Sequence, residues 1–154
     1  MKPDLTNPIH LLAFGFGSGL SPKAPGTFGT LAAVPLYLLL APLPLPLYLM
    51  IVAVTFALGV GICGITSDDL GVHDHSGIVW DEFVGLWVAL IAAPPGWWWI
   101  VVGFLLFRLF DIWKPWPSGW ADRRVSGGLG IMLDDLIAGL YALAVLQVSA
   151  WLLG

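Results

Sequence analysis

The chain has 154 residues, of which 58% are apolar and 10% charged, and its mean hydropathy is +0.90. Soluble domains usually carry about 25% charged residues, so this composition argues against a soluble domain, and the net charge of −4 argues against a nucleic-acid partner. The single cysteine, Cys63, excludes an internal disulfide. We therefore predict one membrane-embedded, all-α domain over residues 1–154, and a soluble helical core is the less favoured alternative.

The N-terminal part is apolar but interrupted. Residues 5–20 are rich in glycine, which predicts a short interfacial helix or a packed entry segment. Residues 21–30 form a turn-rich loop that carries Lys23, and Thr27 or Thr30 is expected to cap the helix that follows. Five apolar segments come next, at residues 28–40, 47–65, 78–93, 97–110 and 130–153.

The lengths of these five segments differ. The second is about 28 Å long as a helix, and both it and the fifth are long enough to span a bilayer. The other three reach only about 20–24 Å as helices. They are expected to be thin spans or partly re-entrant helices packed inside the protein. The prediction is a polytopic helical bundle of about five apolar helices, with an N-terminal interfacial segment.

The charged residues indicate an orientation. When the segments run alternately up and down, the charged residues fall on one side, and the turns at residues 41–46 and 94–96 carry none. Lysine and arginine mark the cytoplasmic face of membrane proteins. We therefore expect a multi-pass protein with its charged side in the cytoplasm.

Two acidic pairs mark the starts of apolar segments. Asp81-Glu82 is followed by Gly85, and Asp134-Asp135 is followed by Gly139. Small residues let two helices approach closely, and grouped carboxylates repel one another unless a cation lies among them. Oxygen ligands suit Mg²⁺, with Mn²⁺ as an alternative. The pattern thus predicts a metal site, although acids that merely cap interfacial helices would look the same.

The basic residues predict a phosphate site beside the metal. Arg108, Asp111 and Lys114 share one helix face, and Lys23 lies in the N-terminal loop. Arginine grips phosphate oxygens in a fork and lysine supplies a point charge. The alternative is a positive-inside signal plus an Arg108–Asp111 ion pair.

Other chemistry has less support. His73 and His75 flank Asp74 without further zinc ligands, so a loop role is favoured, with His75 as a candidate proton donor. Cys63 lies in an apolar run and is expected to be a buried small residue. Motifs for a covalent cysteine, aspartate or histidine intermediate are absent from the sequence, which favours metal-assisted attack by water.

Four stretches resemble the phosphatidylglycerophosphatase A family. They are GFGSGLSPKAPGTFGTLAA (15–33), GVHDHSGIVWDEFVG (71–85), FRLFDIWKPWP (107–117) and GGLGIMLDDLIAG (127–139). The resemblance implies an all-helical, magnesium-dependent enzyme of the bacterial inner (cytoplasmic) membrane. It would remove the terminal phosphate of phosphatidylglycerophosphate and give phosphatidylglycerol and inorganic phosphate.

The residues and the resemblance together give a specific hypothesis. The metal ligands are expected to be Asp81, Glu82, Asp134 and Asp135. The substrate-binding residues are expected to be Lys23, Thr27, Arg108 and Lys114. Catalysis is assigned to the four metal ligands and Asp111, one of which serves as the base. The partners would be the substrate and membrane lipids, with the oligomeric state left open. A divalent-cation transporter and another membrane phosphotransferase are the alternatives.

Overall fold

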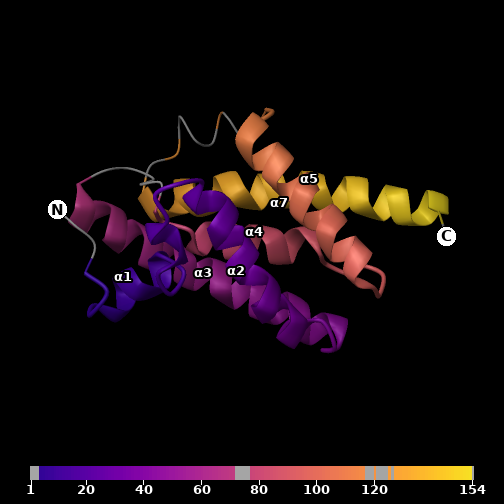
Figure 1. Cartoon of the computed structure of the whole chain (residues 1–154), viewed down its shortest axis with the longest axis horizontal. Helices are drawn as coiled ribbons and strands as arrows, with labels where there is room; N and C mark the ends of the chain where they lie inside the picture. The colour runs from indigo at the N-terminus through magenta and orange to yellow at the C-terminus, as the bar shows by residue number, and fades with distance from the viewer. Residues whose placement is uncertain (1–3, 72–76, 117–119, 121–124, 126, 154) are drawn as a thin grey trace.

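The chain folds into helices. The computed structural model describes residues 4–71, 77–116, 120, 125 and 127–153, and every regular element within them is helical. The elements are α1 (Pro8–Ala13), the 3-10 helix η1 (Ser18–Leu20), α2 (Pro25–Leu40), α3 (Leu45–Leu70), α4 (Trp80–Ala89), α5 (Trp97–Trp113) and α7 (Gly127–Leu153). The all-α prediction is confirmed for these residues, and each of the five apolar segments forms one helix (Figure 1).

Two of the described helices, α3 and α7, are long and apolar enough to cross a membrane. They have 26 and 27 residues, and only 22% of the most apolar window of each is buried within the protein. Most of their apolar surface therefore faces outward, unlike that of a core helix in a soluble protein. The other three apolar helices, α2, α4 and α5, have 16, 10 and 17 residues. The expected set of about five apolar helices is present, but only two of those described reach spanning length.

The uncharged turns and the polar segments lie at opposite ends of the molecule. The turn from α2 to α3, the turn from α4 to α5 and the end of α7 lie toward one end of the long axis (Figure 1). Helix α1, the end of α3 and the start of α7 lie toward the other end (Figure 1). The uncharged turns predicted from the sequence are thus separated from the polar segments.

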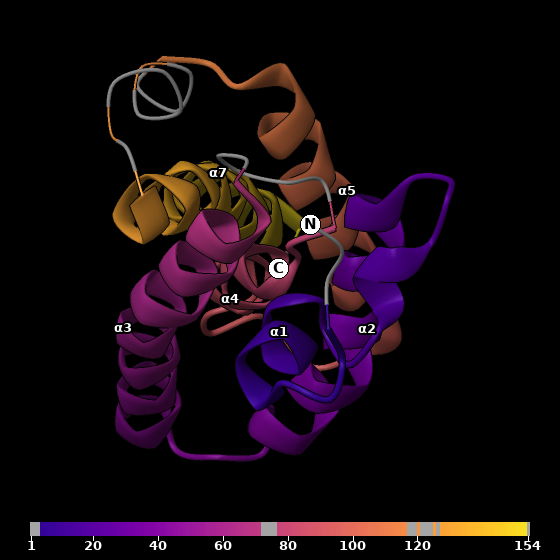
Figure 2. The ribbon, with the colours of Figure 1, turned by 90° about the vertical axis from the view of Figure 1, so that its left-hand side faces the viewer.

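Helix α4 occupies the centre of the bundle. All ten of its residues are buried, including Asp81 and Glu82 in its first turn. Seen along the long axis, the other helices surround it (Figure 2), and it contacts α2, α3, α5 and α7. At about 15 Å it is too short to cross a bilayer core. It is therefore a short helix packed inside the protein, one of the two alternatives expected for this segment.

Side chains of neighbouring helices hold the C-terminal end of α4. The hydroxyl of Tyr48 donates to the carbonyl of Trp87. The amide of Gln147 donates to the carbonyls of Ile91 and Ala92, at 3.0 Å each. Carbonyls at a helix end lack partners within the helix, and leaving them unpaired in an apolar interior is costly. These bonds satisfy carbonyls in and just beyond the last turn of α4 and so fix the depth at which the helix sits.

Glycines bring α4 and α7 into close contact, as the sequence predicted. A Cβ atom added at Gly139 would lie 2.6 Å from the carbonyl oxygen of Gly85. A Cβ atom added at Gly85 would lie 3.1 Å from the carbonyl oxygen of Asp135. The two acid-bearing helices therefore touch at the backbone, next to their carboxylates.

We expect the substitution Gly139→Ala to destabilise the protein, because the new methyl group meets a backbone carbonyl that cannot move independently. Overpacking of this kind costs about 1–3 kcal/mol. Gly61→Ala is the matched control, since a Cβ atom there meets nothing within 4 Å and alanine favours helix by about 1 kcal/mol. Thermal unfolding in detergent should show a lower midpoint for Gly139→Ala only. Equal midpoints for the two variants would contradict the close contact.

Candidate active site

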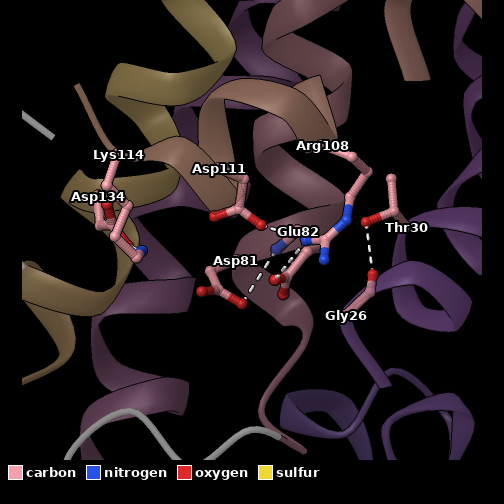
Figure 3. Close-up of polar contacts among 8 residues, drawn as sticks. All are labelled: Gly26, Thr30, Asp81, Glu82, Arg108, Asp111, Lys114 and Asp134. Carbon is pink, nitrogen blue, oxygen red and sulfur yellow. Dashed lines mark hydrogen bonds and ion pairs between the residues drawn. The ribbon is translucent and has the colours of Figure 1, made fainter. Parts of the chain in front are cut away.

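A pocket of about 330 Å³ lies where α2, α4, α5 and α7 meet. The start of α2, the first turn of α4, the end of α5 and the acidic pair of α7 all contribute to it. Its lining residues are Ala24, Pro25, Gly26, Ile78, Asp81, Glu82, Arg108, Asp111, Ile112, Lys114, Asp134 and Asp135. Five carboxyl groups and two basic side chains thus share one pocket. Figure 3 shows most of these charged side chains pointing toward one another.

The two acidic pairs reach the pocket in different ways. Asp81 and Glu82 lie in the first turn of α4, as predicted. Asp134 and Asp135 do not start their helix, because α7 already begins at Gly127. The prediction that both pairs lie at the start of a helix is therefore wrong for α7. This pair lies within a continuous helix, and Asp134 and Asp135 are only 1% and 2% exposed.

The carboxylates form two overlapping sets rather than one group of the four predicted ligands. Asp81, Glu82 and Asp135 each offer an oxygen, and these oxygens lie within 4.8 Å of one another. Asp111, Asp134 and Asp135 form a second set by the same measure. Asp135 belongs to both sets, and Asp111, expected only as a candidate base, is part of the cluster.

The donor set has the chemistry of a divalent-cation site. All its ligand atoms are carboxylate oxygens, which hard cations such as Mg²⁺ and Mn²⁺ prefer. The Oδ2 atom of Asp135 is buried and has no hydrogen-bond partner among the described residues. A buried carboxylate oxygen without a donor is costly unless a cation approaches it. The residues present therefore fit a bound metal ion.

Arg108 lies between the carboxylates and the start of α2. Its guanidinium pairs with Asp111, three residues along α5, and its Nη1 atom is 3.6 Å from Oε1 of Glu82. Its Nε atom is buried without a hydrogen-bond partner among the described residues. A Cβ atom at Gly26 would come within 3.0 Å of both terminal guanidinium nitrogens. The absence of a side chain at Gly26 therefore provides the space that the Arg108 guanidinium occupies.

Lys114 completes the basic part of the pocket. It ends α5 with a left-handed backbone conformation, at φ 53°, and its ammonium pairs with Asp134. Burial alone would lower the pKa of Lys114, but the hydrogen bond that its ammonium donates to Asp134 and the charges of Asp134, Asp111 and Asp135 raise the pKa above its ordinary value. Lys114 therefore keeps its positive charge at neutral pH.

Helix α2 begins at the pocket without a side-chain cap. Its N-cap is Ala24, with φ 46°, and Pro25 occupies the first turn. The expected capping by Thr27 or Thr30 is wrong, because the hydroxyl of Thr30 instead donates to the carbonyl of Gly26 within the helix, at 2.7 Å (Figure 3). A helix start carries partial positive charge and favours anions. The sequence analysis predicted this helix from residue 28, whereas it begins at Pro25, and the missed signal is the Pro-Gly pair that opens the apolar run.

Several predicted residues lie elsewhere. Lys23 is exposed, and neither Lys23 nor Thr27 is among the residues that line the pocket. His73 and His75 lie outside the described residues. Cys63 is buried, as expected, with its thiol 3.9 Å from the sulfur of Met132. The pocket therefore brings together Arg108, Lys114 and all five predicted catalytic carboxylates.

Comparison with known proteins gives a consistent result. The family model described as phosphatidylglycerophosphatase A matches residues 11–150. A relative of that name from Escherichia coli (strain K12) is 51% identical over 153 residues, covering 97% of this chain and 89% of the relative. Another, from Haemophilus influenzae, is 49% identical over 155 residues and covers 99% of this chain and 95% of the relative.

A third relative carries a different name. This protein, from Bacteroides thetaiotaomicron, is 39% identical over 153 residues, covering 94% of each chain. It is named as a phosphatidylinositol-3-phosphatase, in a form that marks the assignment as provisional. No solved structure matches the chain.

Proposed function

Since the chain belongs to the phosphatidylglycerophosphatase A family, we propose that it removes the terminal phosphate of phosphatidylglycerophosphate and releases phosphatidylglycerol and inorganic phosphate. The observation that carries the proposal is the convergence of five carboxylates, Arg108 and Lys114 in one pocket. This combination suits a phosphate ester, because basic groups bind its oxygens and clustered acids hold a cation beside it.

The proposal places the protein in the bacterial inner (cytoplasmic) membrane as a multi-pass protein. Helices α3 and α7 supply the spanning length, and their apolar surfaces face outward. Arg108 and Lys114 lie at the pocket, and basic residues favour the cytoplasmic face. The active site would therefore open on the cytoplasmic side, where the headgroup enters while the acyl chains stay in the bilayer.

Mg²⁺, or Mn²⁺ in its place, would be held by Asp81, Glu82 and Asp135, and by Asp135 with Asp111 and Asp134. When bound, the cation would neutralise charge on the phosphate oxygens and make a bound water more acidic. The carboxylates alone would repel the substrate, so the cation also explains how an anionic phosphate enters an acidic pocket.

The chain's own residues would position the phosphate and move one proton. Arg108 and Lys114 bind its oxygens, together with the start of α2. One pocket carboxylate, with Asp111 as a candidate, accepts a proton from the water that attacks phosphorus. The phosphorus–oxygen ester bond breaks, and the same carboxyl group returns the proton to the departing alcohol. The products are inorganic phosphate and the free hydroxyl of phosphatidylglycerol.

The test is phosphate release by the purified protein from three phospholipids in mixed micelles, with and without Mg²⁺. Phosphatidylglycerophosphate should be hydrolysed faster than phosphatidic acid and phosphatidylinositol 3-phosphate. Faster release from either of the other two would reassign the substrate. Flux of a divalent cation across liposomes without any phosphate release would favour the transporter alternative.

We expect Arg108→Lys to lower kcat/KM by about 10- to 100-fold, because lysine keeps the charge but loses the fork that binds two phosphate oxygens. The ion pairing with Asp111 and Glu82 should largely survive, so the thermal midpoint should stay within a few degrees. Initial-rate kinetics on phosphatidylglycerophosphate measure the effect. A change below threefold would show that Arg108 serves the structure and not the phosphate.

A further inference from the structure

A separate apolar groove lies between α2 and α5, two of the helices that line the candidate active site. It has a volume of about 240 Å³ and is lined only by apolar side chains. Leu31 and Val34 of α2 form one wall, and Ile100, Val101, Phe104 and Leu105 of α5 form the other. The groove therefore lies between the two helices that also border the pocket on the side of Arg108.

The groove lies further along α2 and α5 than the residues of these helices that line the pocket. The two helices run in opposite directions (Figure 1), and Gly26 lies against Arg108 where they meet the pocket. Along the axis of α2, Leu31 and Val34 lie about 8 Å and 12 Å beyond Gly26. Along the axis of α5, Leu105 and Val101 lie about 5 Å and 11 Å from Arg108, also on the side away from the pocket. The contact region between α2 and α5, which we call the α2–α5 seam, therefore has a charged group, Arg108, at its pocket end and apolar side chains further along.

We propose that this groove holds one acyl chain of the phospholipid substrate while its headgroup occupies the pocket. The inference rests on the proposed function, since it takes the pocket's ligand to be a lipid phosphate. Polar and apolar parts follow one another along the seam in the order found in a phospholipid. The groove is smaller than the roughly 300–1,000 Å³ pockets that enclose whole small molecules, so it fits a stretch of one chain. Leu31, Val101 and Leu105 are all more than one-third exposed, so the chain could enter from the side.

Filling the groove tests the proposal. Val101→Trp places an indole between α2 and α5, and Val54→Trp is the matched control, on an exposed apolar site of α3 away from the groove. Each variant is assayed on diacyl phosphatidylglycerophosphate and on its water-soluble deacylated headgroup. Val101→Trp should lower kcat/KM at least tenfold for the diacyl lipid, because losing the burial of two methylenes already has about that effect. The headgroup reaction should change less than twofold, and Val54→Trp should alter neither.

A second measurement does not depend on turnover of the headgroup. A phosphatidylglycerophosphate with a photoreactive group in one acyl chain should label the α2–α5 groove, and unlabelled substrate should compete while phosphatidylcholine should not. Labelling spread evenly over α3 and α7 would show ordinary bilayer lipid and overturn the proposal. The proposal would also be overturned if Val101→Trp lost equal activity on both substrates or lost none on either. A change of oligomeric state in this variant would do the same, because a second copy of the chain would then be the occupant of the groove. By contrast, the absence of phosphate release by the unmodified protein would overturn the proposed function itself.

Discussion

Asp135→Asn is expected to lower phosphate release by about 10³-fold or more, the largest effect of any single substitution in the pocket. Asp135 is the one residue that belongs to both carboxylate sets, so its loss removes a ligand from each. Asparagine has nearly the same shape but no charge, and it cannot replace a carboxylate toward a cation. Initial rates on phosphatidylglycerophosphate with saturating Mg²⁺ measure the loss.

The same variant makes a second prediction that separates function from folding. Asp135 is buried beside other carboxylates, and removing one of several like charges relieves repulsion. The thermal midpoint of Asp135→Asn in metal-free buffer should therefore be no lower than that of the unmodified protein. Asp69→Asn is a suitable control, because Asp69, near the end of α3, pairs with His10 of α1 and does not line the pocket. Activity of Asp135→Asn within tenfold of the unmodified protein would refute its central position.

Removal of divalent cations should have an effect of similar size. Treatment with EDTA is expected to reduce phosphate release by about 10²-fold or more, since the clustered carboxylates would then face the anionic substrate without a counter-charge. Mg²⁺ should restore the rate, and Mn²⁺ should do so at least in part, because both take oxygen ligands of this kind. Full activity in the presence of EDTA would remove the metal from the proposal while leaving the family assignment intact.

Metal binding also has a readout that does not involve turnover. A ligand that binds only the folded protein raises its stability, by about 2.7 kcal/mol when present at 100 times its dissociation constant. The thermal midpoint of the unmodified protein should therefore rise with Mg²⁺, whereas that of Asp135→Asn should rise much less. An identical rise for the two proteins would place the cation somewhere other than the carboxylate cluster.

Much of the helical architecture could be predicted because its signals are local. Pro44 is the N-cap residue of α3 and Gly96 is the N-cap residue of α5. The ends of these apolar segments therefore follow from residues that stop or start helices. Gly85 and Gly139 were expected to allow close contact, and the backbones of α4 and α7 meet at these residues. The resemblance to the family, carried by four stretches of sequence, is confirmed by the match over residues 11–150.

Other features depended on how the helices are rotated and how deeply they are set. Asp134 and Asp135 are neighbours in sequence, but successive helix residues point about 100° apart. Asp134 consequently pairs with Lys114, while Asp135 reaches both carboxylate sets. Nothing local to this pair indicates which of the two faces Asp81 and Glu82.

The sequence by itself determined the apolar helices, their breaks, the family and the residue types of the candidate site. The helices and their breaks are set by side chains within a few positions of one another, and the family is carried by four stretches of sequence. Only the tertiary structure decided that α4 is enclosed, that Asp111 joins the carboxylates, that Gly26 makes room for Arg108 and that Lys23 lies outside the pocket. The physical reason is that helix rotation and depth are fixed by packing between residues distant in the chain. Gly85 on Gly139 and Gln147 on the end of α4 are two such contacts, and together they place the acids of α4 opposite those of α7.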